Sequence, residues 1–144
     1  MDRFFNALYR ERTNGWPPLV IRVATGLFFI SISRGKFFAH ASETDDFDRY
    51  GIPFPAAMVI VVGVVELVCG IALVIGFGTR IAAAVLAANM IGAIATAGRV
   101  DGGSFHLGVA PSMLALMLVL VWAGPGRFSV DRVLASRRGS AAAE

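Results

Sequence analysis

Four long apolar runs constrain the fold of this 144-residue chain more than any other feature. Each run approaches the roughly 20 residues that a helix needs to cross about 30 Å of hydrocarbon. The runs cover residues 19–38, 55–77, 81–98 and 107–123. A soluble bundle would need a polar face on every helix, and the last three runs have none. We therefore predict an all-α fold, an integral membrane four-helix bundle that forms a single domain over residues 1–144.

Composition and charge support this class and exclude others. Hydrophobic residues make up 56% of the chain and charged residues 16%, against about 45–50% and about 25% in soluble domains. The net charge of +3 is small, and the basic residues lie at the ends of the apolar runs rather than on one basic face. Nucleic acid is therefore not an expected partner, and the lipid bilayer is.

The single cysteine, Cys69, limits the redox chemistry that the chain can perform alone. An internal disulfide, a CxxC centre, an iron–sulfur cluster and a structural zinc site all need more thiols. No metal site is expected, and no GxSxG, P-loop, HExxH or GxGxxG motif occurs in a suitable context. Electron chemistry would need a borrowed cofactor or a partner protein.

The distribution of Arg and Lys predicts the orientation in the membrane. Eight basic residues border one side of the runs, Arg3, Arg10, Arg12, Arg80, Arg127, Arg132, Arg137 and Arg138. Four border the other side, Arg34, Lys36, Arg49 and Arg99. We predict that both termini are cytoplasmic. Short interfacial helices are expected at each end, in residues 1–15 and 128–138.

Glu66 lies near the middle of the second run and is the first candidate functional residue. A carboxyl group at the bilayer centre costs roughly 2.5–3.5 kcal/mol on insertion scales, so it needs a partner or a cavity. One interpretation is a structural ion pair with the first run. The other is a proton relay or a quinone ligand.

The first run offers partners along one helical stripe, Arg22, Gly26, Phe29, Ser33, Lys36 and His40. A polar stripe on a membrane helix should face protein, and either Arg22 or Lys36 could reach Glu66. The alternative for both basic residues is that they snorkel to the lipid headgroups.

Small residues predict close contacts between helices. Gly26, Gly63 and Gly70 let another backbone approach, and Ala84, Ala88 and Gly92 form a small-residue face on the third run. Asn89 lies beside that face and should donate or accept a hydrogen bond across the bundle. His40 and His106 end the first run and begin the fourth; they are either interfacial residues or a two-histidine haem or metal site, for which a third ligand is missing.

Several motifs in order carry a family resemblance. They are Arg22-x3-Gly26-x2-Phe29 with Gly35-Lys36, Gly63-x2-Glu66-x3-Gly70-x2-Leu73, Gly78-Thr79-Arg80, and the closing Gly124-Pro125-Gly126-Arg127-Phe128-Ser129-Val130-Asp131. Together they resemble the DoxX family of small four-helix inner-membrane proteins. That family is similar to the membrane subunits of thiosulfate:quinone oxidoreductase, and its actinobacterial members are associated with a membrane complex that includes superoxide dismutase and a thiosulfate sulfurtransferase.

The resemblance implies a membrane subunit or anchor of a redox complex in sulfur or oxidative-stress metabolism, with quinone as the small molecule and superoxide dismutase or a sulfurtransferase as partners. The residues proposed to form a buried polar or quinone site are Glu66, Arg22, Lys36, Ser33, Asn89 and His40. The alternative is a non-catalytic scaffold or accessory subunit. A small transporter is less favoured, because four short spans without an inverted repeat leave little room for alternating access. A homo-oligomer is compatible with each of these functions.

Overall fold

Four antiparallel helical segments form the membrane bundle in the computed structural model, which describes residues 16–126 and 128–141. The elements that cross the membrane are α2 (Trp16–Phe38), α4 (Pro55–Ile75), α5 (Thr79–Ala95) with α6 (Ala97–Val100), and the π-helical turn η1 (Phe105–Val109) with α7 (Ala110–Ala123). All four segments are long and apolar enough to span a membrane, and no strand occurs in the described residues. The predicted all-α membrane fold is confirmed, and its orientation stays a prediction.

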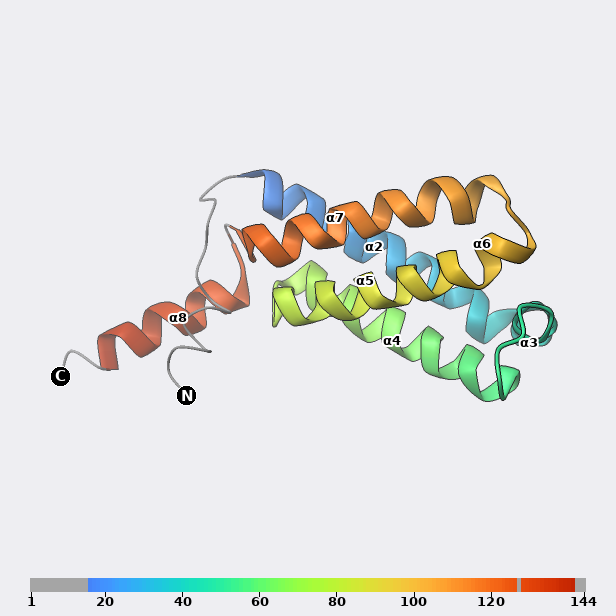
Figure 1. Ribbon diagram of the computed structural model, residues 1–144. Coiled ribbons are helices and arrows are strands. Elements are labelled where there is room, and N and C mark those ends of the chain that lie inside the picture. Colours follow the sequence, from blue (N-terminus) through green and yellow to red (C-terminus); the bar gives the residue numbers. More distant parts are fainter. Residues whose placement is uncertain (1–15, 127, 142–144) are drawn as a thin grey trace.

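Two shorter helices mark the two ends of the bundle (Figure 1). The acidic connection after the first span folds into α3 (His40–Arg49), and α8 (Val130–Ala141) follows the last span at the opposite end. We call these the α3 end and the α8 end. The predicted C-terminal helix corresponds to α8. The predicted N-terminal interfacial segment, residues 1–15, lies outside the described residues.

The helices pack in two close pairs, α2 with α4 and α5 with α7. The α2–α4 pair depends on glycine, as predicted. A Cβ atom added to Gly26 would lie 2.7 Å from the Gly70 carbonyl oxygen, and one added to Gly70 would lie 2.9 Å from the Gly26 carbonyl oxygen. Neither position can carry a side chain without separating the two backbones.

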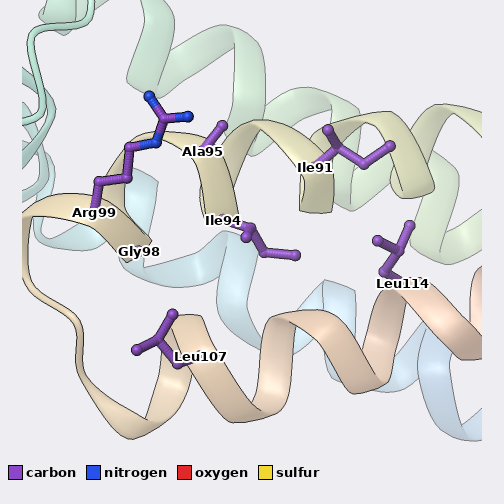
Figure 2. Close-up of a pocket in the computed structure, with 7 residues that line it drawn as sticks. All are labelled: Ile91, Ile94, Ala95, Gly98, Arg99, Leu107 and Leu114. Carbon is purple, nitrogen blue, oxygen red and sulfur yellow. The ribbon is translucent and has the colours of Figure 1, made fainter.

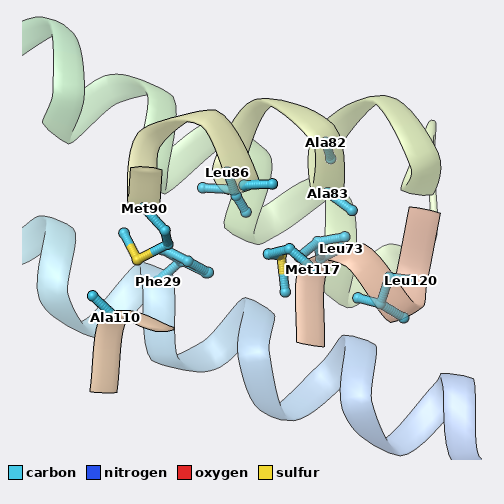
Figure 3. Close-up of a cluster of buried hydrophobic side chains, with 10 residues drawn as sticks. Phe29, Leu73, Ala82, Ala83, Leu86, Met90, Ala110, Met117 and Leu120 are labelled. Atoms are coloured by element: carbon cyan, nitrogen blue, oxygen red, sulfur yellow. The ribbon is translucent and has the colours of Figure 1, made fainter. Parts of the chain in front are cut away.

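An apolar core joins the two pairs inside the bundle (Figure 3). Phe29 of α2 and Leu73 of α4 meet Leu86 and Met90 of α5 and Met117 of α7, all of them buried. Since these side chains come from all four segments, the core fixes how the segments face each other. The same packing fixes the positions of the polar side chains of the bundle, which are described below.

The packing face of α5 differs from the prediction. Ala84, Ala88 and Gly92 are exposed on the outside of the bundle, and a Cβ atom added to Gly92 would meet nothing within 4 Å. The buried face of α5 consists of Thr79, Ala82, Ala83, Leu86, Ala87 and Met90. The physical reason is that α5 is apolar or small nearly all round, so two different small-residue faces exist and periodicity alone does not select between them.

Candidate functional site: a buried polar cluster inside the membrane bundle

Glu66 joins three helices through its two carboxylate oxygens. Its side chain is only 3% exposed, and Oε2 lies 3.1 Å from the Nζ atom of Lys36 on α2. Asn89 of α5 donates a hydrogen bond from Nδ2 to Oε1 at 3.0 Å. We call Lys36, Glu66 and Asn89 the membrane cluster. It satisfies the need of a carboxylate in hydrocarbon for a charged partner and a hydrogen-bond donor.

Lys36 reaches Glu66 because α4 has a glycine in its path. A Cβ atom added to Gly63 would lie 3.0 Å from the Cβ atom of Lys36, so the lysine stem passes directly over this position. Glu66 lies three residues further along α4, which is about 4.5 Å deeper in the bundle. Lysines near the ends of membrane helices usually extend toward the surface. Here Lys36 extends inward, so the snorkelling alternative does not describe it.

A second carboxylate, Glu43 of α3, lies on the outer side of Lys36. Its Oε2 atom is 3.8 Å from Lys36 Nζ. Side-chain exposure falls from 31% at Glu43 to 12% at Lys36 and 3% at Glu66. The three ionisable groups therefore form a continuous row from the surface at the α3 end into the membrane interior. Sequence reasoning placed Glu43 only in an acidic loop, because the folding of α3 against α2 and α4 is a tertiary feature.

Two other residues of the α2 stripe are satisfied locally. Ser33 is buried and donates a hydrogen bond to the Ile30 carbonyl at 2.8 Å. The Nδ1 atom of His40 lies 3.4 Å from the Lys36 carbonyl oxygen, at the start of α3. Among the described residues, neither makes a hydrogen bond or an ion pair to Glu66. Of the stripe, Arg22, Gly26, Phe29 and Ser33 are buried in the bundle.

Arg22, the other candidate partner of Glu66, acts at the α8 end. It is 1% exposed and donates from Nη1 to the Pro125 carbonyl and from Nη2 to the Phe128 carbonyl, both at 3.0 Å. Gly76 leaves the space for its guanidinium, since an added Cβ atom would overlap Arg22 Nη1. Arg22 thus neither snorkels nor meets Glu66. It holds the chain segment that follows the last membrane helix.

Asp131 completes this end of the bundle; the sequence identified it only as the last residue of the closing motif. Its two carboxylate oxygens accept hydrogen bonds from the backbone N–H groups of Gly78 at 2.7 Å and Thr79 at 2.9 Å. Asp131 also donates its own backbone N–H to the Gly76 carbonyl at 3.0 Å. It therefore caps the N-terminus of α5 from a distant part of the chain. The sequence contained one signal for this contact. The Gly78-Thr79-Arg80 motif and the closing motif that ends at Asp131 are both predicted to lie on the same side of the membrane.

At the α3 end, a polar contact ties α3 to α6. Arg49 donates to Asp101 Oδ2 at 3.1 Å, and the Tyr50 hydroxyl donates to the same oxygen. Burial, followed by this hydrogen bond to Asp101, raises the pKa of Tyr50 above its ordinary value. The His106 ring packs edge-on against Tyr50 at 6.1 Å between centroids. Among the described residues no group of three or more His, Cys, Asp or Glu that could hold a metal ion occurs.

Comparison with known proteins adds a family and two relatives. The DoxX family model matches residues 18–99. An uncharacterized membrane protein of Mycobacterium tuberculosis is 37% identical over 137 residues, which cover 84% of each chain. A Bacillus subtilis protein named "Putative oxidoreductase CatD" is 33% identical over 78 residues, 54% of this chain and 57% of its own length. No solved structure matches.

Proposed function

Because the chain belongs to the DoxX family of membrane proteins, we propose that it is the membrane subunit or anchor of a redox complex and that the membrane cluster is its quinone-interacting site. The observation that carries this proposal is the buried Lys36–Glu66–Asn89 arrangement, an ion pair and an amide held between three membrane helices. The similarity to a protein named as an oxidoreductase supports it. The proposed location is the inner (plasma) membrane.

The donors of the membrane cluster suit the carbonyl oxygens of a quinone. A lysine ammonium has three N–H groups and an asparagine amide has two, so Lys36 and Asn89 each retain a donor after bonding Glu66. Asn89 is partly exposed at the side of α5, whereas Glu66 is buried. A bound quinone would supply two-electron, two-proton chemistry. The chain's own residues would orient the ring, and Glu66 would hold a proton at its carboxylate.

In this proposal, protons reach the site along the row from Glu43 through Lys36 to Glu66. Each step is an ion-pair distance, 3.8 Å and then 3.1 Å, and exposure falls along the row. Electrons must come from a partner, because the chain's single cysteine and its motifs provide no redox centre. We propose soluble partners for this role, with superoxide dismutase or a sulfurtransferase as the candidates that the family suggests.

A second candidate function is a scaffold without chemistry. It is favoured by the observation that both oxygens of Glu66 are engaged within the protein and that its side chain is 3% exposed. In that case the ion pair holds α2, α4 and α5 together and the partner proteins contain the whole reaction. The two functions differ in what happens when Glu66 loses its charge.

The test is purification of the complex in mild detergent from cells that express the wild type, Glu66→Gln, Asn89→Leu or Ser33→Ala. Ser33→Ala is the matched control, since it removes a buried hydroxyl of the same stripe that bonds only its own helix. We expect bound quinone and quinone-linked activity in the wild type and the control, and their loss in the other two variants with partner proteins retained. Normal activity in the Glu66→Gln complex that remains, with less complex assembled, would establish the scaffold instead.

A further inference from the structure

A groove on the surface of the bundle lies apart from the membrane cluster, on the other side of α5. It has a volume of about 480 Å³ and runs between α5–α6 and η1–α7 near the α3 end. Figure 2 shows its lining, Ile91, Ile94 and Ala95 from α5, Leu107 and Leu114 from the facing segment, and Arg99 at one end. Pockets of about 300–1,000 Å³ are typical of small-molecule sites.

Small residues leave this space open. Gly98 also lines the groove, and an added Cβ atom would lie 3.7 Å from both His106 Cβ and Leu107 Cδ2, an ordinary contact distance. Ala95 is exposed and contributes only a methyl group. The helix is interrupted between α5 and α6 at Thr96, where φ is −104° and ψ is −81°. Near the α3 end, therefore, no large side chain of α5 or α6 fills the space between α5–α6 and η1–α7.

Arg99 gives the groove one charged end. It lies one residue before the last residue of the third membrane segment, Thr79–Val100, and its side chain is exposed. The neighbouring carboxylate, Asp101, is already paired with Arg49. In the part of the chain that the structure describes, the Arg99 side chain has no ion pair or hydrogen bond. The groove thus has an apolar length inside the membrane and a cation at its surface end.

We propose that this groove binds an anionic phospholipid, with an acyl chain along Ile91–Gly98 and the phosphate on Arg99. Arg99 lies eight positions after Ile91, which corresponds to a length of about 12 Å along the helix. A guanidinium binds phosphate oxygens through two parallel N–H groups. A zwitterionic lipid would place its own cation beside Arg99. The nearby carboxylate of Asp101 is already paired with Arg49 and would not balance that second cation. Net negative charge should therefore decide which lipid occupies the site.

Native mass spectrometry of the purified chain, titrated with phosphatidylglycerol or phosphatidylcholine of identical acyl chains, tests this proposal. We expect phosphatidylglycerol to bind about tenfold more tightly, a difference of about 1.4 kcal/mol. Arg99→Gln should remove this preference. Ala95→Trp should weaken both lipids, because the added ring fills the groove. Ala95→Leu is a smaller block for use if the tryptophan variant does not fold.

Arg34→Gln is the matched control. Arg34 is an exposed arginine near the same end, and its guanidinium lies 5.9 Å from the centre of the Phe38 ring rather than in the groove. This variant should keep the preference for phosphatidylglycerol. Equal binding of the two lipids, or equal loss in Arg34→Gln and Arg99→Gln, would overturn the proposal. So would a dimer that Ala95→Trp converts to monomer, or a quinone that competes with phosphatidylglycerol for the groove.

Discussion

The ion pair between Lys36 and Glu66 should make a large and measurable contribution to the stability of the bundle. The two side chains are 12% and 3% exposed, and their charged atoms are 3.1 Å apart. Removing one partner of a buried ion pair costs about 3–5 kcal/mol, because the remaining charge is left without compensation. We expect Lys36→Met to fall in this range, since Glu66 would keep only the hydrogen bond from Asn89.

Glu66→Gln should cost less than Lys36→Met. Lys36 would still have Glu43, whose Oε2 atom is 3.8 Å away and whose side chain is 31% exposed. A glutamine could also accept one hydrogen bond through its amide oxygen. The expected loss is about 1–3 kcal/mol, the usual cost of an unsatisfied buried polar group.

The double variant Lys36→Met/Glu66→Gln decides whether the two residues interact. We expect its loss of unfolding free energy to be smaller than the sum of the single losses by about 2 kcal/mol, within the range for residues in direct contact. Unfolding in mixed micelles with increasing sodium dodecyl sulfate, followed by far-ultraviolet circular dichroism, measures all three variants. Arg34→Gln, on an exposed side chain, should change the unfolding free energy by less than about 0.5 kcal/mol. Additivity of the two single losses would refute the ion pair as the link between α2 and α4.

Three further outcomes follow from the other contacts. Asp131→Ala should cost about 1–2 kcal/mol, the value of a helix N-cap, in the same unfolding assay. Gly26→Leu should lower the free energy of unfolding by about 3 kcal/mol or prevent folding, whereas Ala84→Leu should change it by less than about 0.5 kcal/mol. A large effect of Ala84→Leu would mean that the face of α5 containing Ala84 is buried against another chain. Tyr50 should ionise above the ordinary pH range of tyrosine, because its pKa is raised in the folded protein. Its contribution to stability is therefore complete below that range and is lost as pH rises through the raised pKa. Titration of the tyrosine absorbance should show a lower midpoint in Asp101→Asn than in the wild type.

The sequence was sufficient for the features that depend on one segment at a time. Apolar length predicted the four spans, and the helical stripe of α2 correctly predicted a face directed into protein. Gly26 and Gly70 were predictable as contact points because a glycine on a membrane helix lets another backbone approach closely. The membrane position of Glu66 predicted that it has a partner, because the energetic cost of an isolated carboxylate is independent of the fold.

Features that depend on the relative position of two segments were not determined by the sequence. Both Arg22 and Lys36 were compatible with Glu66, and the choice depends on which end of α2 lies beside the middle of α4. On α5, the exposed residues Ala84 and Ala88 are as small as the buried residues Ala83 and Ala87. Only the packing of α5 against α7 and α4 distinguishes the two faces. The contact of Asp131 with the start of α5 likewise requires the chain to return to the same end of the bundle.

Arg22 and Lys36, two of the three basic residues of α2, explain why one helix can serve two separate ends of the protein. Arg22 and Lys36 are fourteen residues apart, which places them about 21 Å from each other along the axis, so their charges act on different groups. Arg22 bonds only backbone carbonyls near the α8 end, which are present in any folded copy of the chain. Lys36 bonds a carboxylate whose protonation state can change. Loss of Arg22 therefore affects the folded structure alone, whereas loss of Lys36 affects both the structure and any chemistry at Glu66. This separation makes the membrane cluster, rather than the stripe as a whole, the unit on which the proposed function depends.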